Sequence, residues 1–185
     1  MTDTEIIDLF FARSDQAIRA LAAKHGGAVQ HVAYNILANP QDTEECVNYT
    51  YLGVWNSIPP NRPSPLRTYV CKIARNLATK QYHVNTAQKR NSQYDLALDE
   101  LAECIPDGRT VEGEYTAKEL AAAIDRFLDT LSYEDRFLFM RRYWYADSLA
   151  DIAAMTGMSY STVAVRIHRA KEKLRKQLIK EDMLE

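Results

Sequence analysis

The residues from Ser148 to Leu178, SLADIAAMTGMSYSTVAVRIHRAKEKLRKQL, decide the fold of the C-terminal part of the chain. Ser148 followed by Asp151 is typical of a helix N-terminus, because a serine side chain can accept a hydrogen bond from the backbone three residues on. Gly157-Met158-Ser159 predicts a tight turn, and its serine can cap a second helix that begins at Tyr160. This order of elements predicts a helix-turn-helix motif.

The second helix of this motif has two different faces. Apolar residues at three- and four-residue spacing predict its buried stripe: Val163, Ile167, Ala170, Leu174 and Leu178. Polar and basic residues with the same spacing form an outer stripe: Thr162, Arg166, Arg169, Lys173 and Lys176. Arginine can donate two hydrogen bonds to guanine, lysine can neutralise phosphates, and the neighbouring Val165 suits a thymine methyl, so this stripe predicts contact with DNA. The alternative is the solvated face of an amphipathic helix.

The composition of the 185-residue chain fits a folded globular protein. Apolar residues make up 46% and charged residues 26%, which is too hydrophobic for wholesale disorder. The acidic residues 1–5 lead into no long apolar run. We therefore expect neither a signal peptide nor a membrane span, and we expect the protein in the cytoplasm.

Residues that bind metals or perform catalysis do not form a recognisable set in this sequence. The cysteines are widely separated and odd in number, so we expect free thiols at Cys46, Cys71 and Cys104. The four histidines lack the spacing of helical metal ligands, and there is no glycine-rich phosphate loop and no His-Glu-x-x-His. We therefore expect no cofactor, no metal site and no enzyme activity.

Charge is segregated along the chain, although the net charge is only −2. Residues 62–90 hold seven basic and no acidic side chains, and residues 136–185 hold ten basic and six acidic ones. Between these blocks, residues 91–135 hold three basic and twelve acidic side chains. Two basic blocks on either side of an acidic one predict two contacts with a polyanion and a connector that avoids it.

Helical periodicity dominates, so we predict an all-α chain of two small helical domains. Residues 1–84 are predicted to form an N-terminal helical bundle, and residues 116–185 a C-terminal domain that contains the helix-turn-helix motif. Residues 85–115 have weak periodicity, many acidic residues and the turn sequence Pro106-Asp107-Gly108. We interpret them as an acidic linker.

Helix starts can be predicted at three places in the N-terminal domain. Thr2 with Glu5 forms a capping box, and Asp42 with Glu45 is interpreted as a second cap. Ser64-Pro65 predicts the start of the last helix, because proline suits the first helical position.

This last helix of the N-terminal domain has a core face and a polar face. One face is predicted to be buried: Leu66, Val70, Ile73 and Leu77. The opposite face carries cationic and hydrogen-bonding side chains: Lys72, Asn76, Thr79 and His83.

The C-terminal domain is predicted to hold a further helix before the helix-turn-helix motif. Ser132 with Asp135 forms its cap, and the helix reaches Tyr145. Three of its apolar residues are predicted to face inward: Phe137, Met140 and Trp144.

Three stretches resemble, in the right order, the sigma-70 family of transcription initiation factors, in its extracytoplasmic-function type. Residues 147–178, which include Arg166-Ile167-His168-Arg169-Ala170, resemble the family's C-terminal domain, region 4. The stretch from Asp42-Thr43-Glu44-Glu45 to Trp55 resembles the family's polymerase-clamp-binding helix. Ile73-Ala74-Arg75-Asn76-Leu77-Ala78 resembles its promoter-melting helix. The resemblance spans nearly the whole chain.

The resemblance implies a factor that binds core RNA polymerase and directs it to specific promoters, with residues 1–84 as region 2 and residues 116–185 as region 4. It implies contact with polymerase for Asp42, Glu44, Glu45, Asn48, Tyr49 and Leu52. It implies capture of the melted −10 strand for Lys72, Arg75, Asn76, Thr79, Lys80, Tyr82 and His83. It implies recognition of −35 duplex for Tyr160, Ser161, Thr162, Val165, Arg166, Arg169 and Lys173.

Two departures from the family pattern concern these residues. Tyr49 stands where the family usually has an acidic residue, and Ala164-Val165 replace a common Lys-Ser, so the −35 sequence cannot be taken from relatives. For Tyr82 and His83, stacking on an unpaired base and packing on the domain are equally open interpretations.

The resemblance also implies a partner anti-sigma protein, and we expect a monomer because each DNA element is read by a different domain.

The alternatives to a sigma factor are a stand-alone helix-turn-helix regulator, usually a dimer on a palindrome, and a sigma-like module for protein interactions. The acidic residues at 42, 44 and 45 beside a basic block argue against the regulator, which needs no second DNA-binding helix.

Overall fold

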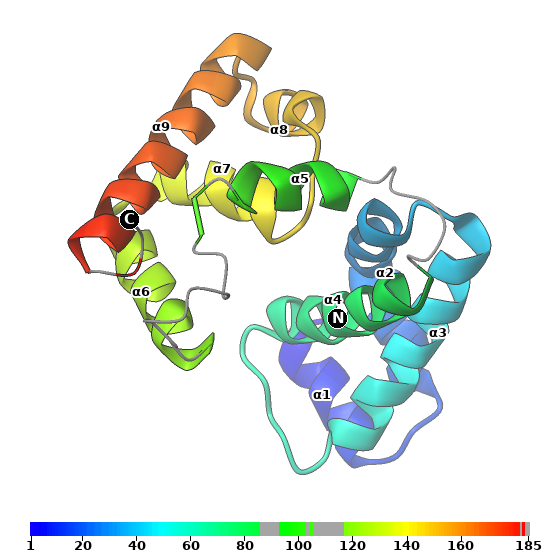
Figure 1. Ribbon diagram of the computed structural model, residues 1–185. Coiled ribbons are helices and arrows are strands. Elements are labelled where there is room, and N and C mark those ends of the chain that lie inside the picture. The colour runs from blue at the N-terminus through cyan, green and yellow to red at the C-terminus, as the bar shows by residue number, and fades with distance from the viewer. Residues whose placement is uncertain (86–92, 103, 106–116, 182, 184–185) are drawn as a thin grey trace. The chain divides into compact units, whose positions relative to one another are not determined.

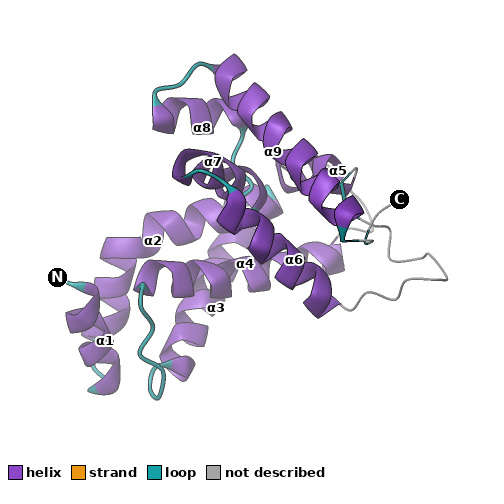
Figure 2. Cartoon of the chain, turned by 90° about the vertical axis from the view of Figure 1, so that its left-hand side faces the viewer, coloured by secondary structure: helices purple, strands orange, loops and turns teal. Residues whose placement is uncertain are grey.

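The structure is a computed structural model that describes residues 1–85, 93–102, 104–105, 117–181 and 183. The chain forms two compact units, Met1–Ser92 and Gln93–Glu185. All regular elements among the described residues are helices (Figure 2), which confirms the predicted all-α fold class. None of the described helices is long and apolar enough to span a membrane.

The first unit packs four helices around one apolar core (Figure 1). They are α1, Asp3–Phe11; α2, Gln16–Leu37; α3, Pro40–Ser57; and α4, Leu66–Asn85. All four contribute fully buried side chains, among them Ile6, Phe10, Leu21, Val29, Val54, Leu66 and Val70. Burial of one such side chain stabilises a fold by roughly 1.5–3 kcal/mol, so this core holds the four helices together.

Two predicted helix starts of the first unit have different outcomes. The Thr2 hydroxyl accepts the N–H of Glu5 at 3.2 Å and the Glu5 carboxylate accepts the N–H of Thr2 at 2.7 Å, which confirms the capping box. The predicted cap at Asp42 is wrong. α3 begins at Pro40, and the Asn39 side chain accepts the N–H of Asp42 at 3.0 Å. Asparagine followed by proline is the stronger start signal, so the helix begins earlier.

The second unit contains the remaining described helices. They are α5, Gln93–Ala102; α6, Ala117–Thr130; α7, Tyr133–Tyr143; α8, Leu149–Thr156; and α9, Tyr160–Lys180. Their core includes Phe127, Leu138, Phe139, Ile152, Val163, Ile167 and Leu174. Two apolar clusters, one in each unit, account for the predicted two-domain architecture.

The helix α5 corrects the predicted linker over residues 85–115. Residues 93–102 pack on α7 as part of the second unit, with Tyr94 buried. The Glu100 carboxylate accepts hydrogen bonds from Arg142 Nε at 3.1 Å and Nη2 at 2.7 Å, and from the Tyr143 hydroxyl at 3.1 Å. The helix has a short apolar stripe of Tyr94, Ala97 and Leu101, but the sequence prediction gave more weight to the acidic residues around it and to the turn at Pro106. Residues 86–92, 103 and 106–115 of the predicted linker lie outside the described residues.

The inward face of α7 also differs from the prediction. Leu138, Phe139 and Tyr143 are buried, whereas Phe137 is 39% exposed. Met140 and Trp144 are half-buried. Residues 137–140 are all apolar, so the pattern leaves the orientation of the helix open, and packing against neighbouring helices sets it.

Candidate functional site

α8 and α9 form the predicted helix-turn-helix motif (Figure 1). The Ser148 hydroxyl accepts the N–H of Asp151 at 3.1 Å, and the Ser159 hydroxyl accepts the N–H of Thr162 at 3.2 Å. Both predicted caps are therefore confirmed. Gly157 ends α8 with a φ of 70°, a left-handed conformation that glycine adopts without strain. This turn sets the direction in which the chain enters α9.

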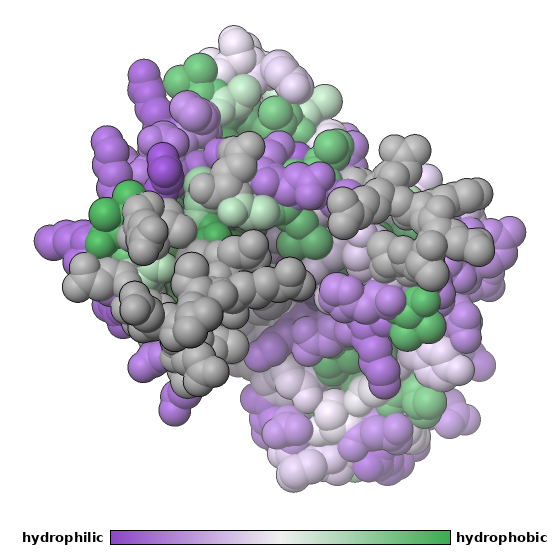
Figure 3. Space-filling model, in the orientation of Figure 1, coloured by the Kyte–Doolittle hydropathy of each residue, from purple (hydrophilic) through white to green (hydrophobic). Residues whose placement is uncertain are grey.

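The two faces of α9 are separated as the periodicity predicts. The buried stripe is Val163, Ile167, Ala170, Leu174 and Leu178. On the opposite side Tyr160 is 58% and Val165 47% exposed. Further exposed side chains there are Ser161, Thr162, Arg169 and Lys173. Figure 3 shows hydrophilic side chains gathered along α9. A surface of this kind can contact both phosphates and base edges of duplex DNA.

Arg166 is the exception among the predicted −35 residues. Its Nε donates to Asp135 Oδ1 and its Nη1 donates to Glu134 Oε2, both at 2.7 Å. Its side chain is 25% exposed, and both carboxylates belong to the first turn of α7. The prediction that Arg166 lies open on the outer stripe is therefore corrected. Helical spacing could not show that another helix brings two carboxylates to this guanidinium.

Asp135 is held in its ionised form by its surroundings. Burial would raise the pKa of Asp135, but hydrogen bonds from Arg166 and Ser132 and the nearby positive charges keep this pKa below its usual value. The Ser132 hydroxyl donates to Asp135 Oδ2 at 2.8 Å and accepts the Asp135 N–H at 3.1 Å. The contact between Arg166 and Asp135 is therefore a charge-assisted hydrogen bond at neutral pH.

α4 begins directly after the predicted start signal Ser64-Pro65. Its buried residues are Leu66, Val70, Cys71, Ala74 and Ala78. Ile73 and Leu77, predicted to belong to the core, are only half-buried. The prediction was based on the large apolar residues, but the small Ala74 and Ala78 face the core. The buried stripe is therefore rotated about the helix axis relative to the predicted one.

The polar face of α4 is open to solvent from Lys72 to His83. Lys72, Asn76, Lys80 and His83 are exposed, and Arg75, Thr79 and Tyr82 are half-buried. The rings of Tyr82 and His83 lie edge to face, with centroids 5.7 Å apart. α4 thus presents cations, an amide and an aromatic pair on one helix, a combination that can bind an unpaired nucleic-acid strand.

The predicted polymerase-contact residues lie on α3. Five of them are exposed: Glu44, Glu45, Asn48, Tyr49 and Leu52. The sixth, Asp42, is half-buried, and its Oδ2 accepts a hydrogen bond from Asn85 Nδ2 at 3.1 Å. Tyr49 is 53% and Leu52 51% exposed. The face is therefore a mixture of acidic and apolar side chains, as in many protein-binding surfaces.

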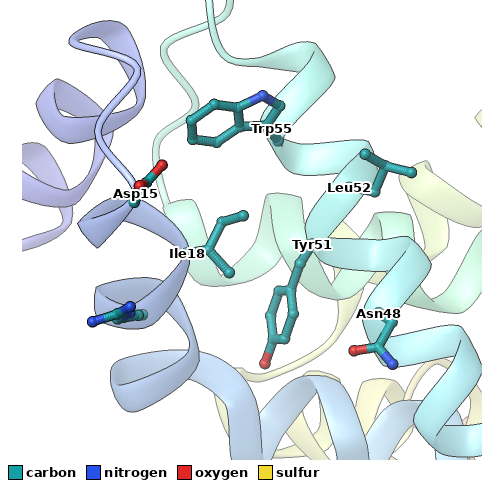
Figure 4. A pocket seen from close by; sticks show the side chains of 7 residues that line it. Asp15, Ile18, Asn48, Tyr51, Leu52 and Trp55 are labelled. Atoms are coloured by element: carbon teal, nitrogen blue, oxygen red, sulfur yellow. The ribbon is translucent and has the colours of Figure 1, made fainter.

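An open groove between α2 and α3 was not predicted from the sequence (Figure 4). It has a volume of about 530 Å³ and is lined by Asp15, Ile18, Arg19, Asn48, Tyr51, Leu52 and Trp55. In Figure 4 Ile18 points from α2 toward α3, whose Tyr51 and Trp55 lie on either side of it. The signal that could have found the groove is the four-residue spacing of these two aromatic residues.

The two units match two family models. Sigma-70 region 2 matches residues 21–87, and Sigma-70 region 4 matches residues 121–174. Each match lies within one of the two units, and together the matches cover more than half of the chain.

Known proteins are similar over most of the chain. The ECF RNA polymerase sigma factor SigE of Mycolicibacterium smegmatis is 27% identical over 177 residues, which are 93% of this chain and 67% of that protein. The ECF RNA polymerase sigma factor SigW of Bacillus subtilis is 25% identical over 161 residues, 81% of this chain and 82% of that protein. The structure of CnrH in complex with the cytosolic domain of CnrY aligns with 96% of this chain and 97% of that chain, at 21% identity and a TM-score of 0.45.

The chain belongs to the sigma-70 family, in its extracytoplasmic-function type. It is a transcription initiation factor that directs RNA polymerase to promoters. Members of this family act by binding and are not catalysts. Within the described part of the chain, no group of three or more His, Cys, Asp or Glu side chains could hold a metal ion.

Proposed function

We propose that α4 of this factor captures the melted −10 strand, α9 reads the −35 duplex, and α3 docks on core polymerase. The observation that carries the proposal is that each unit exposes one helix with basic and hydrogen-bonding side chains, α4 in the first and α9 in the second. Each of these helices lies within the residues that its family model matches, apart from residues 175–180 of α9.

On α4, strand capture is assigned to Lys72, Arg75, Asn76, Thr79, Lys80, Tyr82 and His83. Lys72, Asn76 and Lys80 follow one another at four-residue spacing and are exposed, so they form one row. The two lysines neutralise phosphates, and the amide between them donates to and accepts from an unpaired base. The Tyr82 and His83 rings offer stacking surfaces at the end of this row.

On α9, duplex recognition is assigned to Tyr160, Ser161, Thr162, Val165, Arg166, Arg169 and Lys173. The exposed guanidinium of Arg169 suits a guanine edge, and the exposed Val165 suits a thymine methyl. Lys173, one turn beyond Arg169, suits a phosphate.

On α3, polymerase docking is assigned to Asp42, Glu44, Glu45, Asn48, Tyr49 and Leu52. The exposed acidic and apolar side chains favour a partner surface that offers basic and apolar groups. The same exposed Tyr49 and Leu52 favour a protein inhibitor of the anti-sigma kind, which would cover them. We propose that the factor acts as a monomer in the cytoplasm, where polymerase and DNA are found.

The proposal is tested by transcription in vitro with bacterial core polymerase, this protein and a pool of genomic promoter fragments. Discrete starts that depend on the protein and follow a shared two-part motif are expected. An absence of such starts with folded protein and core enzyme from the same host would favour the stand-alone regulator or the interaction module.

Asn76→Ala separates the roles of the two helices. Loss of the amide is expected to reduce open-complex formation about tenfold, the equivalent of one hydrogen-bonded base contact, while binding to −35 duplex is retained. Asn56→Ala, an exposed asparagine on α3, is the matched control and should change neither. Open complexes are measured by permanganate reactivity of unpaired thymines. Equal losses in both assays would contradict strand capture by Asn76.

A further inference from the structure

Arg166 lies at the edge of the outer stripe of α9, where it faces α7. It precedes the buried Ile167 and follows the exposed Val165, so helix geometry puts it beside the core. Its side chain is 25% exposed, whereas Arg169, one turn further along, belongs to the exposed residues. The two arginines of the same helix therefore have different surroundings.

Two of the three guanidinium nitrogens of Arg166 are already in use. Nε donates to Asp135 and Nη1 donates to Glu134, both at 2.7 Å. A bidentate contact with guanine takes two of the five guanidinium N–H groups. Two of the five already serve carboxylates of α7 and turn the guanidinium toward that helix, so a pairing that turns it toward DNA breaks these contacts. A charge-assisted hydrogen bond contributes as much as the base contact that would replace it. Arg166 would therefore gain little binding free energy by leaving the carboxylates to contact a base.

The two carboxylates have a local reason to be where they are. Asp135 is part of the Ser132 cap of α7, and negative charge in a first turn is favourable to the helix dipole. Their position next to α9 has a cost, because unneutralised carboxylates repel phosphates within a Debye length of roughly 10 Å. Arg166 supplies the positive charge that neutralises them.

We propose that Arg166 is a positioning residue that fastens α9 to the first turn of α7 and screens Glu134 and Asp135 from DNA. Base recognition on α9 then falls to Arg169 and the exposed residues around it. This inference rests on the proposed recognition of −35 duplex by α9. According to this inference, Glu134 and Asp135 influence promoter binding, and Arg166 holds α9 in place and does not contact a base.

The test uses the full chain with bacterial core polymerase and a barcoded pool of promoter fragments whose upstream segment is randomised. Transcripts counted for each barcode give both the total output and the base preference at every upstream position. Arg166→Ala is expected to lower output on all sequences by a similar factor, about three- to tenfold, with unchanged base preferences. Arg169→Ala, the matched control, is expected to flatten the preference at one or two positions.

A rescue experiment separates support from base recognition. Glu134→Gln and Asp135→Asn, added to Arg166→Ala, are expected to restore most of the output, because neutral side chains no longer need a screening cation. Flattening of the preference at one position by Arg166→Ala, without recovery in the triple variant, would overturn the proposal.

A double variant, Glu134→Gln with Asp135→Asn, keeps Arg166. It tests the role of Arg166 even if circular dichroism shows that Arg166→Ala is unfolded. Unchanged base preferences support the proposal. A guanine preference that appears only in this variant shows that the carboxylates keep Arg166 from a base in the wild type, and also supports the proposal. A guanine preference that the wild type already has, and that this variant strengthens at the same position, shows that Arg166 reads that base and overturns the proposal. A wild-type protein with no preference at any upstream position would instead refute the proposed −35 recognition itself.

Discussion

The two units of this factor use charge in different ways. In the first unit, the ion pair of Arg62 with Asp8 lies at the surface, with side chains 53% and 57% exposed. In the second unit, Arg142 is only 3% exposed and is bound by Glu100. A surface pair contributes little, whereas a buried charge that loses its partner is costly. The second unit therefore depends on a buried ion pair in addition to its apolar core, whereas the surface ion pair of the first unit adds little to its core.

The same difference recurs at the two basic helices. α4 lies in a stretch of sequence, residues 62–90, that contains no acidic residue, and its Lys72 and Lys80 are exposed. α9 is also basic, but the fold brings the acidic first turn of α7 to Arg166. A basic block of sequence is therefore not the same as a free cationic surface, because carboxylates from elsewhere in the chain can occupy part of it.

The largest effect is expected from Glu100→Ala in the second unit. The change leaves the buried guanidinium of Arg142 without its carboxylate, which is expected to cost about 3 kcal/mol of unfolding free energy. Urea denaturation measures this loss. Asp99→Ala, the exposed neighbour on α5, is the control and should stay within about 0.5 kcal/mol of wild type. Equal losses of unfolding free energy for the two variants would contradict the conclusion that the second unit depends on its buried ion pair.

A smaller loss is expected in the first unit from Asn39→Ala. The Asn39 side chain caps α3 by accepting the N–H of Asp42, and this hydrogen bond involves no charged side chain. Its removal is expected to cost about 1 kcal/mol. Thermal unfolding at two salt concentrations is the measurement, because the loss should be the same at both. A loss that disappears at high salt would show that charge, and not the cap, is responsible.

Asp135→Asn is expected to have a smaller effect that depends on pH. The folded protein holds the pKa of Asp135 below its usual value, so the ionised side chain stabilises the fold at neutral pH. The advantage of wild type over the variant should be under about 1 kcal/mol and should fall as the pH drops below about 4 through the lowered pKa. Unfolding free energies at a series of pH values test this, and an advantage that grows toward acid pH would contradict it.

The smallest effect is expected from Asp8→Asn at the surface of the first unit. The variant breaks the ion pair with Arg62, but both side chains are more than half exposed. The guanidinium of Arg62 keeps its position over the ring of Phe11, 4.1 Å from the centroid. The expected loss is below about 0.5 kcal/mol in a denaturant titration. A loss close to that of Glu100→Ala would mean that the first unit also depends on its ion pairs.

Local signals in the sequence determined much of the fold. The capping box at Thr2, the caps at Ser148 and Ser159 and the glycine turn before α9 involve residues three or four positions apart, so they can be recognised without the fold. The buried stripe of α9 follows from helical spacing alone. The order of three family motifs predicted the class of protein, which the two family models confirm.

The tertiary structure decided the features that join distant parts of the chain. Glu100 and Arg142 are 42 residues apart, and Asp135 and Arg166 are 31 apart. The groove lined by Ile18 and Trp55 exists only because α2 and α3 lie side by side. Periodicity assigns a residue to a face of its own helix, but it does not say which helix covers that face. For this reason the sequence located the basic helices, and only the fold showed that one arginine of α9 is already engaged.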